Sequence, residues 1–162
     1  MQFRNQYWFL SNMYPCTVCH DNRTFQNAEA AFQSAKCANE ADKDRFVNLN
    51  GKDAKRLGRQ IQMKPDWDIT KLAAVKDILK DKFTRNPDLK QKLLQTGNIP
   101  IVEENTWNDR YWGVCNGQGS NHLGKLLMNV RAELQAEKII QQTIAKAPTE
   151  NASTKHNALP QR

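Results

Sequence analysis

Residues 120–134 read SNHLGKLLMNVRAEL and carry the clearest structural signal in this chain of 162 residues. Apolar side chains recur there every three or four positions, which is the spacing of one face of an α-helix. They are Leu123, Leu126, Leu127, Val130 and Leu134. The stripe predicts an amphipathic helix that runs to about Ala145. Residues 146–162 have no apolar periodicity and are rich in Asn, Thr, Ala and Pro, so we predict a disordered C-terminal tail.

Upstream of this helix the pattern alternates between helical and extended segments. Asn27 has the side chain of an N-cap, and helical spacing or a start signal favours helices at 28–39, 41–48, 53–59, from 68 onward, and from 87 to 97. Short strands are expected at 9–12, 16–19, 24–25, 100–103 and 110–113. The sequence therefore predicts an α+β fold, a mainly helical single domain over residues 1–145 with a few short strands.

Composition excludes several classes of protein. The chain is 39% hydrophobic and 25% charged, as in an ordinary globular domain, and this excludes collagen-like, disulfide-framework and disordered proteins. No apolar run approaches the roughly 20 residues that span a bilayer. The first ten residues, MQFRNQYWFL, lack the apolar region of a signal peptide. We therefore expect a cytoplasmic protein that does not enter a membrane.

Positive charge is concentrated in one part of the chain. The formal net charge is +7, and residues 36–92 hold 15 Lys and Arg against 9 Asp and Glu. Such a segment attracts anions, whether nucleic acid or a phosphate-bearing small molecule, and a solvated helical surface has the same composition. No helix-turn-helix or RNP signature is present. Charge alone leaves these alternatives open.

The cysteines offer a misleading motif. Residues 16–20 spell C-x-x-C-H, the pattern of c-type haem attachment, but haem attachment of that kind requires export. No second pair of ligands completes a zinc site. We expect reduced cysteines on a short strand, and neither a metal nor a cofactor.

One helical stripe carries unusual chemistry. Glu29, Phe32, Gln33 and Lys36 fall at i, i+3, i+4 and i+7, which places them on one face of the 28–39 helix. The alternative is an exposed helix with a Glu/Lys pair, but residues two turns apart cannot pair directly. The stripe favours a functional face.

A glycine-rich loop leads into the 120–145 helix. Free backbone N–H groups at such a helix start suit a phosphate, and a flexible connection with a helix cap is an equally good interpretation. Trp112, close to Asp109, provides a stacking surface beside a carboxylate.

An ordered set of motifs extends these observations. They are FLSN-x-YP at 9–15, NAEAAFQ-x-AK at 27–36, LGR at 57–59, WD at 67–68, KF at 82–83, L-x-TG at 94–97, DRYWG at 109–113 and G-x-N-x-LGKLLM-x-x-R at 119–131. Together they closely resemble the NADAR, or YbiA-like, N-glycosidase family over residues 7–134. Met13 stands where that family more often has Phe, a hydrophobic exchange that leaves the resemblance intact.

The resemblance implies an enzyme that cleaves an N-glycosidic bond to ribose. Its first implied substrate is ADP-ribose attached to guanine, alone or in ADP-ribosylated DNA or RNA. The alternatives are phosphoribosylamino-pyrimidine intermediates of riboflavin synthesis and a non-catalytic module that binds ADP-ribose or related nucleotides. The family's helix glutamate matches Glu29 and its lysine matches Lys36, and we expect these two to be catalytic.

Their chemistry fits the reaction. A carboxylate stabilises positive charge that develops at C1′ and moves a proton to the leaving nitrogen. A neutral Lys36 would instead form a Schiff base with the ring-opened sugar. Substrate-binding roles are expected for Ser11, Asn12, Phe32, Gln33, Arg59, Trp67, Asp109, Trp112, Gly119 and Asn121. The sequence does not indicate an oligomeric state.

Overall fold

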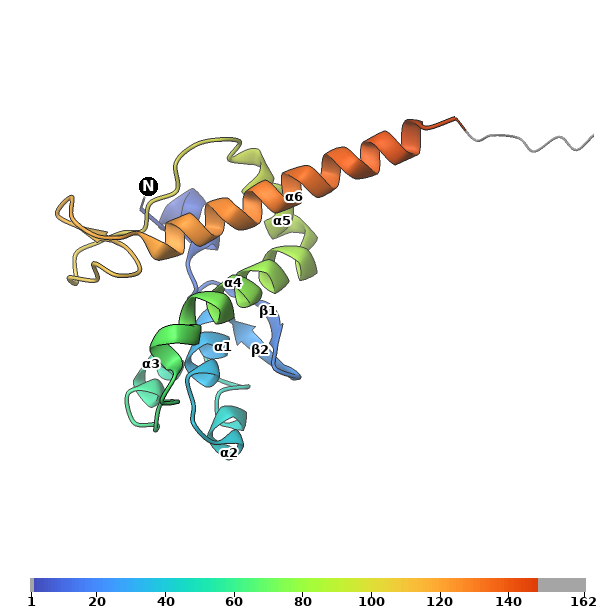
Figure 1. Cartoon of the computed structure of the whole chain (residues 1–162). Coiled ribbons are helices and arrows are strands. Elements are labelled where there is room, and N and C mark those ends of the chain that lie inside the picture. Colours follow the sequence, from blue (N-terminus) through green and yellow to red (C-terminus); the bar gives the residue numbers. More distant parts are fainter. Residues whose placement is uncertain (1, 149–162) are drawn as a thin grey trace, which may run out of the picture.

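The computed structural model describes residues 2–148, and Figure 1 shows their arrangement. The elements are η1 (Asn5–Leu10), β1 (Pro15–His20), β2 (Arg23–Asn27), α1 (Ala28–Ala35), α2 (Glu40–Asp44), α3 (Gly51–Gly58), α4 (Trp67–Arg85), α5 (Pro87–Gln95), β3 (Glu104–Asn105), β4 (Val114–Cys115) and α6 (His122–Lys146). The predicted class, a mainly helical α+β fold with a few short strands, is confirmed. Residues 149–162, most of the predicted tail, lie outside the described residues.

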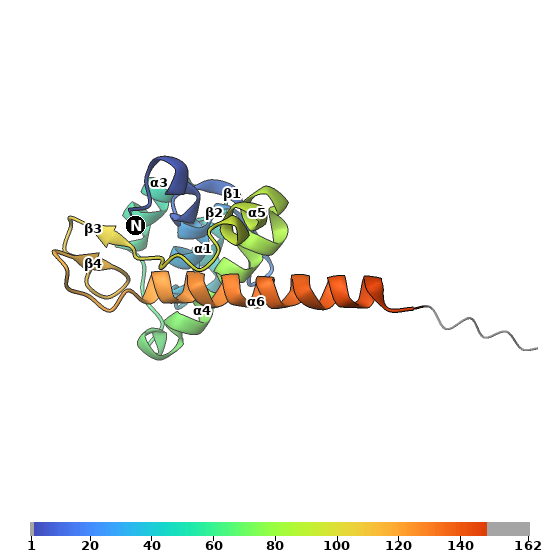
Figure 2. The same cartoon turned by 90° about the horizontal axis from the view of Figure 1, so that it is seen from above.

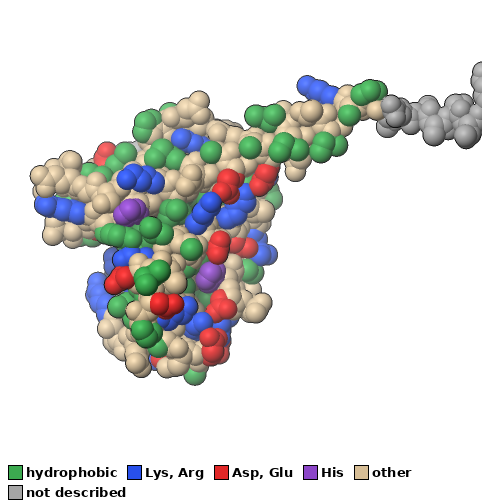
Figure 3. Space-filling model, viewed as in Figure 1, with side chains coloured by type: hydrophobic (Ala, Val, Ile, Leu, Met, Phe, Trp, Pro, Cys, Tyr) green, Lys and Arg blue, Asp and Glu red, His purple; other side chains and the backbone are tan. Residues whose placement is uncertain are grey.

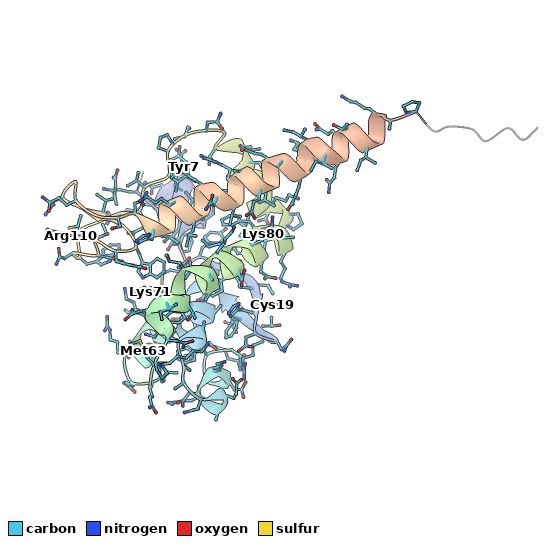
Figure 4. All side chains as sticks on the ribbon, viewed as in Figure 1. Tyr7, Cys19, Met63, Lys71, Lys80 and Arg110 are labelled. Carbon is cyan, nitrogen blue, oxygen red and sulfur yellow. The ribbon has the colours of Figure 1, made fainter. Side chains whose placement is uncertain are left out.

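The apolar stripe of α6 packs on α4, which lies beneath it in Figure 1, and on α5, which crosses behind it. Lys76 and Lys80 of α4 form ion pairs with Glu133 and Glu137 of α6, at 2.7 and 2.6 Å, and Figure 4 shows Lys80 between the two helices. The buried side chains of this first core cluster are Phe9, Leu10, Val75, Leu79, Phe83, Leu89, Leu93, Ile101, Leu123, Leu127, Val130 and Leu134.

A second core cluster lies on the other side of α4 and surrounds α1. Ala28, Ala31 and Ala35 are buried there, and their small side chains let α1 approach α3 and α4 closely. The strands β1 and β2 form an antiparallel hairpin against the same cluster. Asp21 and Asn22 both have positive φ in its two-residue turn, the conformation that type I′ hairpins require.

Two predicted strands, at 9–12 and at 100–103, are wrong. Residues 9–10 of the expected strand 9–12 lie in the 3-10 helix η1, where the Ser11 N–H donates to the Trp8 carbonyl. Two apolar residues are too few to show whether the period is helical or extended. At 100–103 no strand forms, because the Glu103 N–H and the Ile101 carbonyl hydrogen-bond the side chain of Asn121 instead of a neighbouring strand.

The strand expected at 110–113 is displaced to β4, at Val114–Cys115, where it pairs in parallel with β3. The Asp109 carboxylate causes the displacement. It accepts the backbone N–H groups of Tyr111 and Trp112, so these donors are lost to a strand ladder.

The helices begin close to their predicted positions, and some end earlier. Asn27 caps α1 as expected, with the Ala30 N–H donating to its Oδ1 at 2.7 Å. The helix ends at Ala35 rather than at residue 39, because Cys37 forms an antiparallel bridge with Met63. The helix expected at 41–48 is likewise shorter, at Glu40–Asp44.

The distal end of α6 extends beyond the rest of the molecule, as Figure 2 shows from above. Hydrophobic side chains gather on this end in Figure 3, and Ile139, Ile140 and Ile144 are exposed. Across residues 2–148, no helix combines the length and the apolar character needed to cross a membrane.

Candidate active site

A cavity of about 440 Å³ opens between α1, the 11–13 segment, α3 and the loop around β3. Its volume is in the range of small-molecule sites. Six residues predicted for the site line it together, namely Ser11, Asn12, Glu29, Phe32, Gln33 and Trp112. The cavity is also lined by residues that the sequence did not single out, namely Phe3, Arg4, Met13, Lys55, Glu103, Glu104, Trp107 and Leu123.

Glu29 lies in the first turn of α1 with only 8% of its surface exposed. Its backbone N–H donates to the Asn12 carbonyl at 2.8 Å, which ties the start of the helix to the 11–13 segment. Gln33, one turn later, donates through Nε2 to Glu29 Oε1 at 2.8 Å. Burial raises the pKa of the Glu29 carboxyl, and the hydrogen bond from Gln33 opposes this only in part. A carboxyl in this environment is suited to donate a proton.

Two oxygen atoms beside Glu29 have no hydrogen-bond partner. They are Asn12 Oδ1 and Gln33 Oε1, and they are the buried side-chain oxygens or nitrogens without a partner in the described part of the chain. A buried unpaired acceptor costs free energy unless a ligand satisfies it. Gln33 Oε1 packs against Gly58 of α3, whereas Asn12 lies in the cavity wall, where a ligand with a hydroxyl donor would satisfy its Oδ1.

Aromatic rings form one wall of the cavity. Phe32 packs against Trp67 and Trp112, with ring centroids 5.6 Å apart in each pair. Trp67 is buried behind Phe32 and does not line the cavity. Trp107, which does line it, is 58% exposed and offers a flat surface to a base. The aromatic-rich segment 105–113 was the sequence signal that could have found Trp107.

Glu103 provides a second buried carboxyl in the cavity wall. The Glu103 N–H donates to Asn121 Oδ1, and Asn105 Nδ2 donates to Glu103 Oε2, both at 3.0 Å. Burial raises the pKa of Glu103. Asn121, predicted to bind substrate, thus holds the segment that carries Glu103, and no local pattern in the sequence marked that carboxyl.

Lys36 and Arg59 lie outside the cavity wall. Lys36 caps the C-terminus of α1 and is half-buried. Burial lowers its pKa, the nearby Arg59 adds to this effect, and Glu29 opposes it. Arg59 is exposed at the C-terminus of α3, where it lines a smaller hollow.

The glycine-rich loop folds back onto the cavity wall. The N–H groups of His122 and Leu123, the first two of α6, donate to the carbonyls of Tyr111 and Trp112 at 3.2 and 3.0 Å. Gly119 has a φ of 151°, and a Cβ at this position would collide with the backbone of Gly113, so only glycine fits there. The loop and Asp109 therefore hold Trp112 in the wall, and these two helical N–H groups are already bonded.

Within residues 2–148, no group of three His, Cys, Asp or Glu side chains is arranged to hold a metal ion. The four cysteines are free thiols, and Cys16 and Cys19 lie on β1, the strand expected there.

Known proteins share this fold and its motifs. The pattern of the NADAR domain matches residues 2–135. The N-glycosidase YbiA of Shigella boydii is 32% identical over 138 residues, which cover 83% of this chain and 86% of that protein. A riboflavin biosynthesis protein of Vibrio vulnificus is also 32% identical, but the chain spans only 35% of its length.

The solution structure of Escherichia coli YbiA superposes with a TM-score of 0.77 at 27% identity, covering 93% of this chain and 90% of YbiA. The agreement in fold extends the agreement in sequence over nearly the whole chain. The predicted family is confirmed: this chain belongs to the NADAR domain family.

Proposed function

We propose that this protein is an N-glycosidase that hydrolyses the bond between ribose and a base, and that its substrate is ADP-ribose joined to guanine, free or in nucleic acid. The observation that carries the proposal is Glu29, a buried carboxyl of raised pKa on the cavity wall, beside the unpaired acceptor of Asn12. A ribose hydroxyl is a donor of the kind that Asn12 Oδ1 lacks. Trp107 and Trp112 provide flat surfaces for the base.

The reaction follows from this arrangement. When the C1′–N bond breaks, its electron pair moves to the base nitrogen, which takes a proton from Glu29. Positive charge develops at C1′, and the resulting carboxylate stabilises it. Water then adds its oxygen to C1′ and returns a proton to Glu29.

Lys36 has two possible roles in this scheme. Its pKa is lowered by burial, which increases the fraction of neutral amine available to form a Schiff base at C1′ of the ring-opened sugar. Because Lys36 does not line the cavity, that step requires its side chain to turn toward Glu29. As a cation it would instead act electrostatically on Glu29. Trapping with borohydride distinguishes the roles, since only the Schiff base gives a stable covalent adduct.

A second substrate is favoured by the names of relatives. Riboflavin biosynthesis proteins of Vibrio vulnificus and Arabidopsis thaliana are 32% and 30% identical to the chain. Phosphoribosylamino-pyrimidines carry the same ribose–nitrogen bond, so the same residues would cleave them.

The test incubates the full chain with ADP-ribosylated guanosine, an ADP-ribosylated oligonucleotide and the pyrimidine intermediate, and measures released ADP-ribose or ribose phosphate. Glu29→Gln should lower turnover at least about a hundredfold, the usual contribution of a general acid. Glu137→Gln, which changes an exposed carboxylate on α6, is the matched control and should leave turnover intact. Binding of ADP-ribose without turnover of any substrate would show a binding module and overturn the proposal.

A further inference from the structure

One face of α3 is entirely basic. Lys52, Lys55, Arg56 and Arg59 fall at i, i+3, i+4 and i+7, which places them on one side of this helix and its C-cap. The opposite side, at Gly51, Ala54 and Gly58, is buried. The chain thus holds four cations in one row at the edge of the core.

These four residues line a hollow together with Met13. Its volume is about 210 Å³, and none of its lining residues is acidic. Met13 and Lys55 also line the larger cavity, so the two spaces adjoin along these side chains. A ligand that fills the cavity can therefore extend into the hollow.

Three of the four cations of this row have no anionic partner among the described residues. Arg56 pairs with Asp53 at 3.2 Å, whereas the side chains of Lys52, Lys55 and Arg59 have no hydrogen bond or ion pair to any residue in the range 2–148. On α4, by contrast, Lys71, Lys76, Lys80 and Arg85 all pair with carboxylates. The unpaired charge on α3 is available to an anion from solution.

The row also lies within electrostatic range of the catalytic candidates. Lys55 opposes the rise in the pKa of both Glu29 and Glu103, and Arg59 helps to lower the pKa of Lys36. An anion on α3 would therefore lie close to the bond that is cleaved.

We propose that the hollow on α3 is a phosphate subsite, in which Lys52, Lys55 and Arg59 hold the phosphate attached to the 5′ oxygen of the substrate ribose. This deepens the function proposed above and rests on it. Both candidate substrates carry a phosphate at that position, so the subsite serves either one. Phosphate in the hollow places the ribose in the adjoining cavity, with C1′ toward Glu29.

The first experiment measures binding without catalysis. Calorimetric titration of the full chain with ribose 5-phosphate should give a dissociation constant at least about tenfold weaker for the double variant Lys52→Gln/Arg59→Gln, because the loss of even one charge-assisted bond costs about that factor. The control Lys90→Gln/Lys138→Gln removes the same charge from a separate groove between α5 and α6. Equal weakening in both double variants would show unspecific attraction and overturn the subsite.

The second experiment measures selectivity. It compares kcat/KM for one base joined to 5′-phosphoribose with kcat/KM for the same base joined to unphosphorylated ribose. The ratio of the first value to the second should fall at least about tenfold in Lys52→Gln/Arg59→Gln, relative to the control. An unchanged ratio in an active enzyme would overturn the subsite and leave the glycosidase proposal standing. If the unmodified chain has no glycosidase activity but Lys52→Gln/Arg59→Gln specifically weakens the binding of ribose 5-phosphate, the subsite stands and the glycosidase proposal is overturned.

Discussion

Among single residues, Glu29 and Lys36 have opposite shifts of pKa, and the proposed mechanism uses both. Burial raises the pKa of the Glu29 carboxyl and lowers that of the Lys36 amine. If Glu29 acts as an acid and Lys36 as a neutral amine, activity rises with pH as Lys36 loses its proton and falls as Glu29 does. The expected profile of kcat/KM against pH is a bell.

Two variants test the roles of Lys36 and Glu29 in this profile. Lys36→Ala should abolish turnover if the amine is covalent, whereas residual activity would assign it an electrostatic role. Glu29→Gln should abolish turnover at every pH. A profile that rises without limit up to high pH in the unmodified chain would contradict the role of Glu29 as the acid.

Lys82 is a buried ammonium that the mechanism does not use. It donates to the Ser11 carbonyl at 2.9 Å, and complete burial lowers its pKa from 10.5 to about 8. The unfolded chain therefore binds this proton more tightly than the folded chain, and the free energy of unfolding rises with pH between about 8 and 10.5. Below pH 8 the penalty is fully present.

The dependence of stability on pH is compared with that of Lys82→Met, whose side chain does not titrate. Urea denaturation at pH 7 and pH 10 should show the wild-type chain gaining about 2–3 kcal/mol relative to the variant, since a shift of one pKa unit corresponds to about 1.4 kcal/mol. Other titrating groups cancel between the two chains. Parallel dependence on pH would show that Lys82 does not carry the shift.

Part of the candidate site could be predicted because its residues are neighbours in sequence. Glu29, Phe32 and Gln33 share one face of α1, so helical spacing alone brings them together. Lys55 and Glu103 come from segments that only tertiary packing brings to the same cavity. No local period records such packing, which is why the sequence missed them.

Among elements, the contact between α1 and α3 controls the geometry of Glu29. A Cβ on Gly58 would collide with the side chain of Gln33, which donates to Glu29. Gly58→Ala should therefore destabilise the fold by about 1–3 kcal/mol and lower kcat by displacing Gln33. Thermal unfolding and steady-state kinetics measure the two effects.

A double-mutant cycle identifies the cause. Gln33→Ala provides room for the new methyl group, so the double variant should lose less stability than the sum of the single variants. Strict additivity would mean that Gly58 matters for a reason other than its approach to Gln33.

The predicted elements are confirmed where the apolar period extends over several turns or where clear start and stop residues bound the helix. The stripe of α6 repeats over three turns, and Pro87 and Gly97 bracket α5 as expected, with Gly97 at a φ of 59°. The strand predicted at 100–103 was wrong because the backbone there finds its hydrogen-bond partners in the side chain of Asn121, the residue before α6. Side-chain partners of this kind leave no periodic trace in the sequence.

For the whole molecule, the net charge of +7 includes cations that pair with carboxylates and cations that do not. Four cations of α4 pair with neighbouring carboxylates, while Lys52, Lys55 and Arg59 have no such partner among the described residues and lie beside the cavity. An excess of positive charge near an active site steers anionic substrates toward it. The strength of this attraction depends on whether the substrate is a small molecule or a nucleic acid.

Salt separates these two substrates. Each phosphate neutralised on a single strand contributes a slope of about −0.7 in log K against log salt, so a strand that makes three phosphate contacts loses about twentyfold in affinity between 50 and 200 mM salt. We expect kcat/KM on an ADP-ribosylated oligonucleotide to fall by about this factor, and on ADP-ribosylated guanosine to fall less. The same pair measured with Lys90→Gln/Lys138→Gln controls for net charge. Identical salt dependence of the two substrates would mean that the nucleic acid beyond its adduct makes no contact with the protein, and the free nucleoside adduct would then be the better description of the substrate.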